Sequence, residues 1–137
     1  MEKKWYQQDL SKKWWFWVLL AGCLLFIVLA YSLSSSDTKE DAKEKAQYYI
    51  SNYTEDRKAY SREELIEKLE RDGYSKNDAT YGADNSGADW KQQAAFQAGI
   101  YLVVLPNLTK NELYEMLLKD GFTEEQALYG IRANGFY

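Results

Sequence analysis

One stretch occurs twice, as YSREELIEKLERDGYSKNDATYGADNSG at residues 60–87 and as LTKNELYEMLLKDGFTEEQALYGIRANG at residues 108–135. The two copies lie 48 residues apart and align here without a gap. The shared positions are two leucines, an Asp-Gly pair and an Ala-x-Tyr-Gly segment: Leu65 and Leu113, Leu69 and Leu117, Asp72-Gly73 and Asp120-Gly121, Ala79 and Ala127, Tyr81-Gly82 and Tyr129-Gly130. A fixed period of this length indicates one supersecondary unit used twice. We therefore predict two tandem repeats, residues 41–88 and residues 89–136.

Each copy carries two signals for the start of a helix, separated by a glycine. In a capping box, a hydroxyl accepts a hydrogen bond from an amide of the first turn, and the acidic or amide side chain three residues later reaches back. That spacing is present in Ser61 with Glu64, Thr109 with Glu112 and Thr123 with Gln126, and more weakly in Ser75 with Asp78. Gly73 and Gly121 can adopt the left-handed conformation that ends a helix. Each copy is thus expected to form a helix, a tight turn and a second helix.

A longer helix is expected before each of these helix pairs. Apolar side chains recur at spacings of three and four, which places them on one helical face. They are Ala42, Ala46, Ile50 and Tyr53 in the first copy, and Trp90, Ala94, Ala98 and Tyr101 at the matching places in the second. Pro106 ends the second long helix, because the residue before a proline disfavours helical geometry. Residues 41–137 are therefore predicted to be an all-α domain of two three-helix repeats, each containing a helix-turn-helix.

Gly82 and Gly130 fall inside the predicted third helices. Glycine costs about 1 kcal/mol relative to alanine in a helix interior. Two interpretations remain open: the glycines mark a close approach of two helices, or they fray the helix ends.

The first forty residues have the pattern of a membrane anchor. Residues 1–13 are polar and basic, and residues 14–31, WWFWVLLAGCLLFIVLAY, carry no charge. A helix of this length covers about 27 Å, which is enough for a bilayer core. Lysines before the span predict a cytoplasmic N-terminus and place residues 41–137 outside the plasma membrane. Residues 32–40 form a polar linker.

A lipid anchor at Cys23 is the competing hypothesis. Leu20-Ala21-Gly22-Cys23 resembles the lipobox of a bacterial lipoprotein signal, and cleavage there would leave Cys23 to carry acyl chains. The apolar run before Cys23 is short, however, and the segment after it, LLFIVLAY, is strongly apolar. These features favour an uncleaved span, in which Cys23 is one more small apolar residue. Both hypotheses leave the repeats on the outer face of the membrane.

Composition argues against catalysis and against binding of a nucleic acid. The chain has one Cys and no His, so an internal disulfide, a Cys/His zinc site and a histidine general base are all excluded. No nucleophile-base pair, phosphate-binding loop, metal site or cofactor motif is evident, and no small-molecule substrate is indicated. From Asp37 onward there are 19 acidic and 13 basic residues, and phosphate contacts need clustered cations.

The densest acidic stretch is the candidate partner-binding surface. It comprises Glu63, Glu64, Glu67, Glu70, Asp72 and Asp78. A negative surface attracts a basic segment in a salt-dependent way. The alternative is that these carboxylates complement the helix dipole at helix starts and otherwise form an ordinary solvated face.

The repeated pattern resembles the host cell surface-exposed lipoprotein (Ltp) family. The residues that carry the resemblance are Ser61, Glu64, Leu65, Leu69, Asp72, Gly73, Tyr74, Ala79 and Tyr81, their counterparts Thr109, Glu112, Leu113, Leu117, Asp120, Gly121, Phe122, Ala127 and Tyr129, and Asp89-Trp90 between them. The family occurs in Gram-positive bacteria, their phages and their prophages. The resemblance implies a superinfection-exclusion protein that blocks DNA injection by engaging the phage tail tape measure protein.

The alternative function is a structural or adhesive role in the host's own cell envelope. An enzyme is the least favoured class. Gene context and a phage challenge would separate the first two functions.

Overall fold

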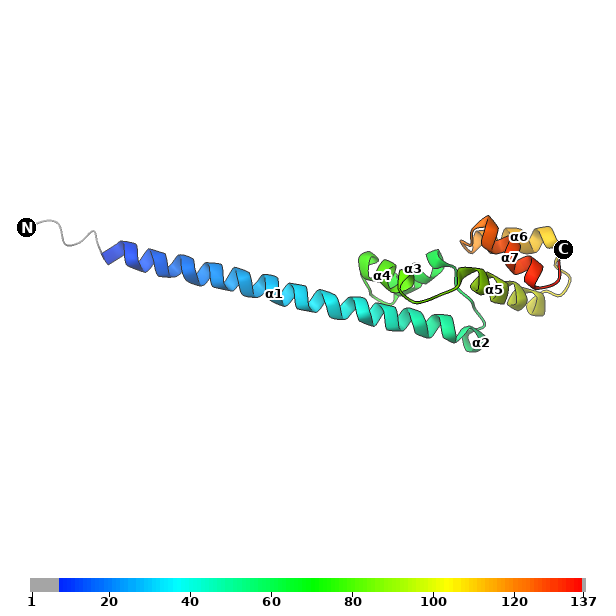
Figure 1. Ribbon diagram of the computed structural model, residues 1–137, viewed down its shortest axis with the longest axis horizontal. Helices are drawn as coiled ribbons and strands as arrows, with labels where there is room; N and C mark the ends of the chain where they lie inside the picture. Colours follow the sequence, from blue (N-terminus) through cyan, green and yellow to red (C-terminus); the bar gives the residue numbers. More distant parts are fainter. Residues whose placement is uncertain (1–7, 137) are drawn as a thin grey trace, which may run out of the picture. The chain divides into compact units, whose positions relative to one another are not determined.

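The computed structural model describes the backbone of residues 8–136, and the side chains in that range except those of residues 8–16, 31–36 and 56. Every regular element in these residues is a helix (Figure 1). The helices are α1 (Gln8–Ser51), α2 (Tyr53–Asp56), α3 (Arg62–Arg71), α4 (Lys76–Asp84), α5 (Trp90–Val104), α6 (Lys110–Lys119) and α7 (Glu124–Ala133). The all-α prediction is confirmed for this part of the chain. The chain divides into two compact units, Met1–Asp37 and Thr38–Tyr137, and the repeats lie in the second.

All four predicted helix caps form, but the reciprocal bond of the capping box is made only in the second repeat. Thr109 and Thr123 form complete capping boxes at the starts of α6 and α7. Ser61 caps α3 by accepting from the amide of Glu64 at 3.2 Å, but its box is incomplete. The Glu64 carboxylate instead accepts from Lys58 Nζ at 2.7 Å. The Glu64 carboxylate, which the sequence pattern predicts to bind the backbone amide of Ser61, therefore binds Lys58.

The two glycine turns have the geometry expected of them. Gly73 has φ 104° and Gly121 has φ 85°, both in the left-handed region. The amide after each glycine donates back to a helix carbonyl, from Tyr74 to Leu69 at 3.2 Å and from Phe122 to Leu117 at 3.1 Å. These six-to-one bonds define a Schellman motif, which ends the helix and reverses the chain.

Each repeat has its own small hydrophobic core. In the first repeat the buried residues are Ala46, Tyr49, Tyr60, Leu65, Leu69, Ala79 and Ala83. In the second they are Ala94, Ala98, Leu113, Leu117, Phe122, Ala127 and Ile131. The leucines at matched positions of α3 and α6 are fully buried. Burial of these matched side chains supplies the main stabilisation of each helix trio.

The long first helices match in a different register from the rest of the repeat. Tyr49 donates to Asp72 at 2.5 Å, across 23 residues, whereas Tyr101 donates to Asp120 at 2.5 Å, across 19 residues. Asp72 and Asp120 are 48 residues apart, but the two tyrosines are 52 apart. The ungapped match of Tyr53 with Tyr101 is therefore wrong by one helical turn.

The short helix α2 accounts for this difference. It is 4 residues long and lies between the first and second helices of the first repeat only. The counterparts of Ala94 and Ala98 are consequently Ala42 and Ala46, and each of these four alanines is fully buried. Because of this four-residue insertion, the helix-turn-helix parts of the two repeats are 48 residues apart, whereas their first helices are 52 residues apart.

Gly82 and Gly130 are sites of close helix approach, and the hypothesis of frayed ends is wrong. A Cβ on Gly82 would lie 2.6 Å from the carbonyl oxygen of Ala42, and one on Gly130 would lie 2.7 Å from that of Ala94. Both glycines are buried. In each repeat the third helix therefore meets the first helix at backbone distance.

Two hydrogen bonds join the two repeats, one buried and one partly buried. Ser61 Oγ donates to the backbone carbonyl of Asp120 at 2.5 Å, and the Ala59 amide donates to Gln97 Oε1 at 2.9 Å. Trp90, at the start of α5, packs against the core of the first repeat. Ser61 and Gln97 are buried polar side chains, so these bonds satisfy groups that would otherwise be costly. We call Ala59, Ser61, Gln97 and Asp120 the inter-repeat contact.

Replacing Ser61 by alanine tests the inter-repeat contact against a matched cap. Ser75→Ala removes a helix cap and an exposed bond to Asp78 in the same turn, and we expect a loss of about 1 kcal/mol in unfolding free energy. Ser61→Ala also removes the bond to Asp120, so the loss is expected to be about 2 kcal/mol. Urea unfolding followed by circular dichroism measures both. Equal losses would show that the bond between the repeats adds no stability.

The predicted membrane segment, residues 14–31, lies within α1. The side chains of residues 14–16 and 31 fall outside the described ones. Within the part that is described, no helix has the length and apolar character needed to cross a membrane. Residues 32–40, expected as a linker, also lie within α1. Cys23, in the predicted membrane segment, is exposed.

Candidate functional site

The six acidic candidates fall into two groups. Glu63, Glu67 and Glu70 are exposed on α3, at spacings of four and three residues, so they share one helical face. Glu67 lies 3.9 Å from Arg71 in an exposed pair, which adds little stability. Glu63 also borders the turn of the second repeat, since a Cβ on Gly121 would lie 3.1 Å from its Oε2. These three carboxylates form the part of the candidate surface that is open to a partner.

Glu64, Asp72 and Asp78 make contacts within the domain. Burial raises the pKa of Glu64, and this effect exceeds that of its bond to Lys58. Burial also acts to raise the pKa of Asp72, but bonds from Lys68 at 2.5 Å and Tyr49 at 2.5 Å outweigh it and hold that pKa below its usual value. Asp78 accepts from Ser75 Oγ at 2.8 Å in the first turn of α4. The six carboxylates therefore do not form one continuous surface.

The second repeat contains a partly buried tyrosine-carboxylate pair that sequence reasoning did not single out. Burial and the bond that Tyr101 donates to Asp120 raise the pKa of Tyr101 to about 12. The matched pair in the first repeat is Tyr49 with Asp72, where Lys68 also donates to the tyrosine oxygen at 2.8 Å. Recurrence in both repeats indicates a structural role, since each pair ties the first helix to the glycine turn.

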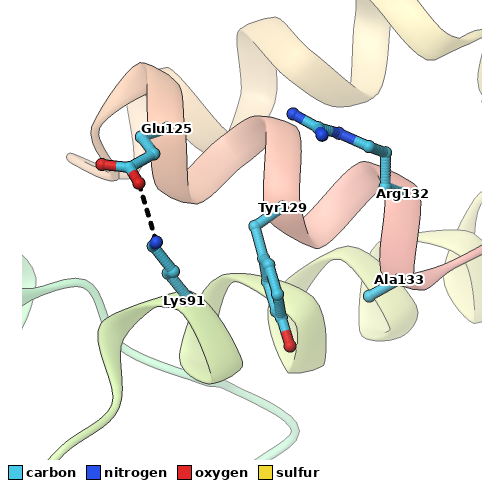
Figure 2. Close-up of a pocket in the computed structure, with 5 residues that line it drawn as sticks. All are labelled: Lys91, Glu125, Tyr129, Arg132 and Ala133. Carbon is cyan, nitrogen blue, oxygen red and sulfur yellow. Dashed lines mark ion pairs between the residues drawn. The ribbon is translucent and has the colours of Figure 1, made fainter.

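A shallow hollow of about 460 Å³ lies between α5 and α7 (Figure 2). Lys91 of α5 forms an ion pair with Glu125 of α7 at 2.7 Å, and Tyr129 points toward α5. The matched residues of the first repeat are also close, because Lys39 Nζ lies 5.8 Å from the centre of the Tyr81 ring. A lysine beside this tyrosine therefore occurs in both repeats. Because it recurs, we attribute it to the architecture of the repeat and do not assign a binding site to the hollow.

A larger apolar groove, of about 710 Å³, lies between α2 and α5. Its lining residues are Tyr53, Thr54 and Arg57 beside α5 residues Ala95, Phe96, Gly99, Ile100, Val103 and Val104, with Asn134 at one end. We call this set the α2–α5 groove. Tyr53 stacks on Phe96 with ring centroids 4.0 Å apart and planes within 6°. Sequence reasoning missed the groove, although the apolar residues that continue around α5 were a signal for it.

The α2–α5 groove opens onto an exposed apolar segment. Val103 is 84% exposed, Val104 is 64% exposed and Leu105 is 44% exposed. Contiguous exposed apolar side chains are typical of binding surfaces. As for inorganic ligands, the described residues contain no group of three or more His, Cys, Asp or Glu side chains placed to hold a metal ion.

The chain thus has two paired helical repeats with an acidic face and an apolar groove. The family model for the host cell surface-exposed lipoprotein matches residues 89–133. Among solved structures, the chain is similar to Ltp, a superinfection exclusion protein from the Streptococcus thermophilus temperate phage TP-J34. The identity is 31% over 69% of this chain and 93% of that chain, with a TM-score of 0.62. The chain belongs to the Ltp family of host cell surface-exposed lipoproteins. No curated protein matches it.

Proposed function

We propose that this protein excludes superinfecting phages by blocking entry of their DNA at the membrane. The observation that carries the proposal is the similarity to a superinfection exclusion protein at 31% identity, over 93% of that protein's chain. The partner we propose is the phage tail tape measure protein. The exposed carboxylates of Glu63, Glu67 and Glu70 and the α2–α5 groove are the surfaces available for it.

The mechanism we propose is recognition, without a chemical step. An acidic domain attracts a basic segment over about a Debye length, roughly 8 Å at physiological salt, and close contacts then hold it. A tail protein that is held at the cell surface can no longer complete its passage. The tyrosine-carboxylate pairs keep each glycine turn in place while this contact forms.

A phage challenge tests the proposal. We expect a host expressing the full chain to adsorb siphophages normally while taking up less phage DNA, measured separately by free-phage counts and by quantitative amplification of internalised DNA. A strain expressing the Leu117→Ala variant serves as a folding control and should lose the protection. Unchanged DNA entry across a broad panel of siphophages would reject exclusion, and an envelope defect in a phage-free deletion strain would favour the host-envelope role.

For the anchor, we propose an uncleaved membrane helix over residues 14–31, with the N-terminus in the cytoplasm and the repeats outside. The support is the uncharged run itself and the apolar segment LLFIVLAY that follows Cys23. Metabolic labelling with a radioactive fatty acid is expected to leave the protein unlabelled. A label that disappears in the Cys23→Ala variant would instead establish a lipid anchor.

A further inference from the structure

We propose that the α2–α5 groove is the docking site for an amphipathic helix of the partner protein, whose apolar face lies along α5 and which presents a carboxylate to Arg57. This inference deepens the proposed function and rests on it for the source of the helix. It assigns the contact to a surface distinct from the exposed carboxylates of α3. Four observations carry it.

The two repeats provide an internal comparison for the outer face of the first helix. In the register set by the tyrosine-carboxylate pairs, residues of α5 match residues of α1 that are 52 positions earlier. The groove residues Ala95, Phe96, Gly99, Ile100, Val103 and Val104 thus match Lys43, Glu44, Gln47, Tyr48, Ser51 and Asn52. Apart from the inserted α2, the two repeats share one fold, and the first repeat keeps that fold without apolar side chains at most of these places. Their apolar character in the second repeat points to a contact outside the repeat.

Exposure at the open end of the groove supports the same conclusion. Val103 and Val104 occupy successive positions of α5, and Leu105 and Pro106 continue the exposed apolar segment. Contiguous apolar side chains that a domain leaves exposed are typical of an interaction site. The domain buries Gln93, Ala94, Ala95, Gln97 and Ala98 of α5, but it leaves Val103 and Val104 at the C-terminal end of this helix exposed.

The inserted helix α2 builds the second wall of the groove. Its Tyr53 ring lies flat on Phe96, and Arg57, in the left-handed conformation at φ 51°, ends α2 beside the groove. The first repeat gains these four residues, and the second repeat has none at the matching place. The insertion of α2 therefore changes the register of the first helices by four residues. It also places the Tyr53 ring against the apolar face of α5.

The chemistry of the groove selects the occupant. Its walls are helices, whose backbone groups are already paired, so a partner strand has no sheet edge to join, whereas a partner helix can place an apolar stripe between the walls. Among the described residues that line the groove, Arg57 is the only charged one, and a carboxylate complements it. The net charge of −6 from Asp37 onward disfavours both a second copy and an anionic lipid surface.

The test uses the full chain in nanodiscs of zwitterionic lipid and a fluorescein-labelled peptide of about 18 residues, built from Leu, Ala, Gln and Lys with a single Glu to pair with Arg57 and with the leucines in one helical stripe. The matched variant is Val103→Ser with Val104→Asn, which installs the residues that the first repeat carries at these places. Leu128→Thr is the control, because it makes the same kind of exchange at an exposed leucine of α7 outside the groove. Empty nanodiscs and a peptide with scattered leucines serve as blanks.

We expect saturable binding to the wild-type chain, at least tenfold weaker binding to the Val103→Ser/Val104→Asn variant, and unchanged binding to Leu128→Thr. Arg57→Gln should weaken binding by a few fold. All variants should keep the wild-type melting curve, because the altered side chains are exposed.

Equal binding by the wild type and the double variant, or no binding by the wild type, would overturn the proposal. A wild-type dimer in analytical ultracentrifugation that the double variant disperses would also overturn it, since the occupant would then be a second copy. If the peptide binds as expected but the chain does not exclude phages, the proposed function is rejected and the docking site is retained. If the Val103→Ser/Val104→Asn variant still excludes phages, the docking site is rejected and the proposed function is retained.

Discussion

Replacing Leu117 by alanine is expected to lower the free energy of unfolding by about 2–5 kcal/mol. Leu117 has no exposed surface, and it packs in the core of the second repeat with Leu113, Phe122 and Ile131. Truncation removes buried methyl groups and leaves a cavity that the surrounding side chains fill only in part. Such a loss is comparable to the total stability of many small domains, so much of the population is expected to be unfolded at growth temperature.

The control for Leu117→Ala is Leu128→Ala, the same substitution on the exposed face of α7. Leu128 is 36% exposed, so we expect its loss to be well below that of Leu117→Ala. Thermal and urea unfolding followed by circular dichroism provide the comparison. A melting temperature for Leu117→Ala equal to that of the wild type would contradict the core as described.

The second large effect is expected for Gly130→Ala, which should cost about 1–3 kcal/mol although alanine is the better helix former. The new Cβ would lie 2.7 Å from the carbonyl oxygen of Ala94 and 3.2 Å from the amide nitrogen of Ala95. Both atoms belong to the backbone of α5, so α7 must move away and loosen the core. Gly82→Ala in the first repeat should behave alike, because the same contact recurs with Ala42.

Gly99→Ala is the matched substitution for this prediction. Its Cβ would meet only Asn134 Oδ1 at 3.2 Å, which is the end of a side chain. We expect a change within about 1 kcal/mol, since the gain in helix propensity offsets a small shift of Asn134. If Gly130→Ala proved as harmless as Gly99→Ala under the same unfolding conditions, the close approach of α5 and α7 would be refuted.

The helix-turn-helix part of each repeat was predictable because its signals are local. A hydroxyl three residues before an acid, or a glycine after a helical run, acts through bonds within one turn, as Thr109 and Gly121 do. The family resemblance rested on the same residues. The prediction failed where a residue outside the helix intervened, because Lys58 binds the Glu64 carboxylate that would otherwise complete the capping box.

The register of the first helices was not predictable from their periodicity. Ala42 and Ala46 are four residues apart, as are Ala94 and Ala98, so a shift of one turn leaves the apolar pattern almost unchanged. Only the tertiary bonds from Tyr49 and Tyr101 to their aspartates separate the two registers. The α2–α5 groove was missed for the same reason, because its contrast with the first repeat emerges only in the shifted register.

The bond from Ser61 to the Asp120 carbonyl affects how repeat units could be added to such a chain or deleted from it. It joins the helix start of one repeat to the turn of the other, so the contact is directional. At the turn of the first repeat, a methyl group added to Gly73 would meet no described atom within 4 Å, and the helix start at Thr109 is exposed. Duplication of a whole unit at either end would leave the existing joint untouched. Deletion of either unit would remove the hydrogen bonds of the inter-repeat contact and the packing of Trp90 against the core of the first repeat.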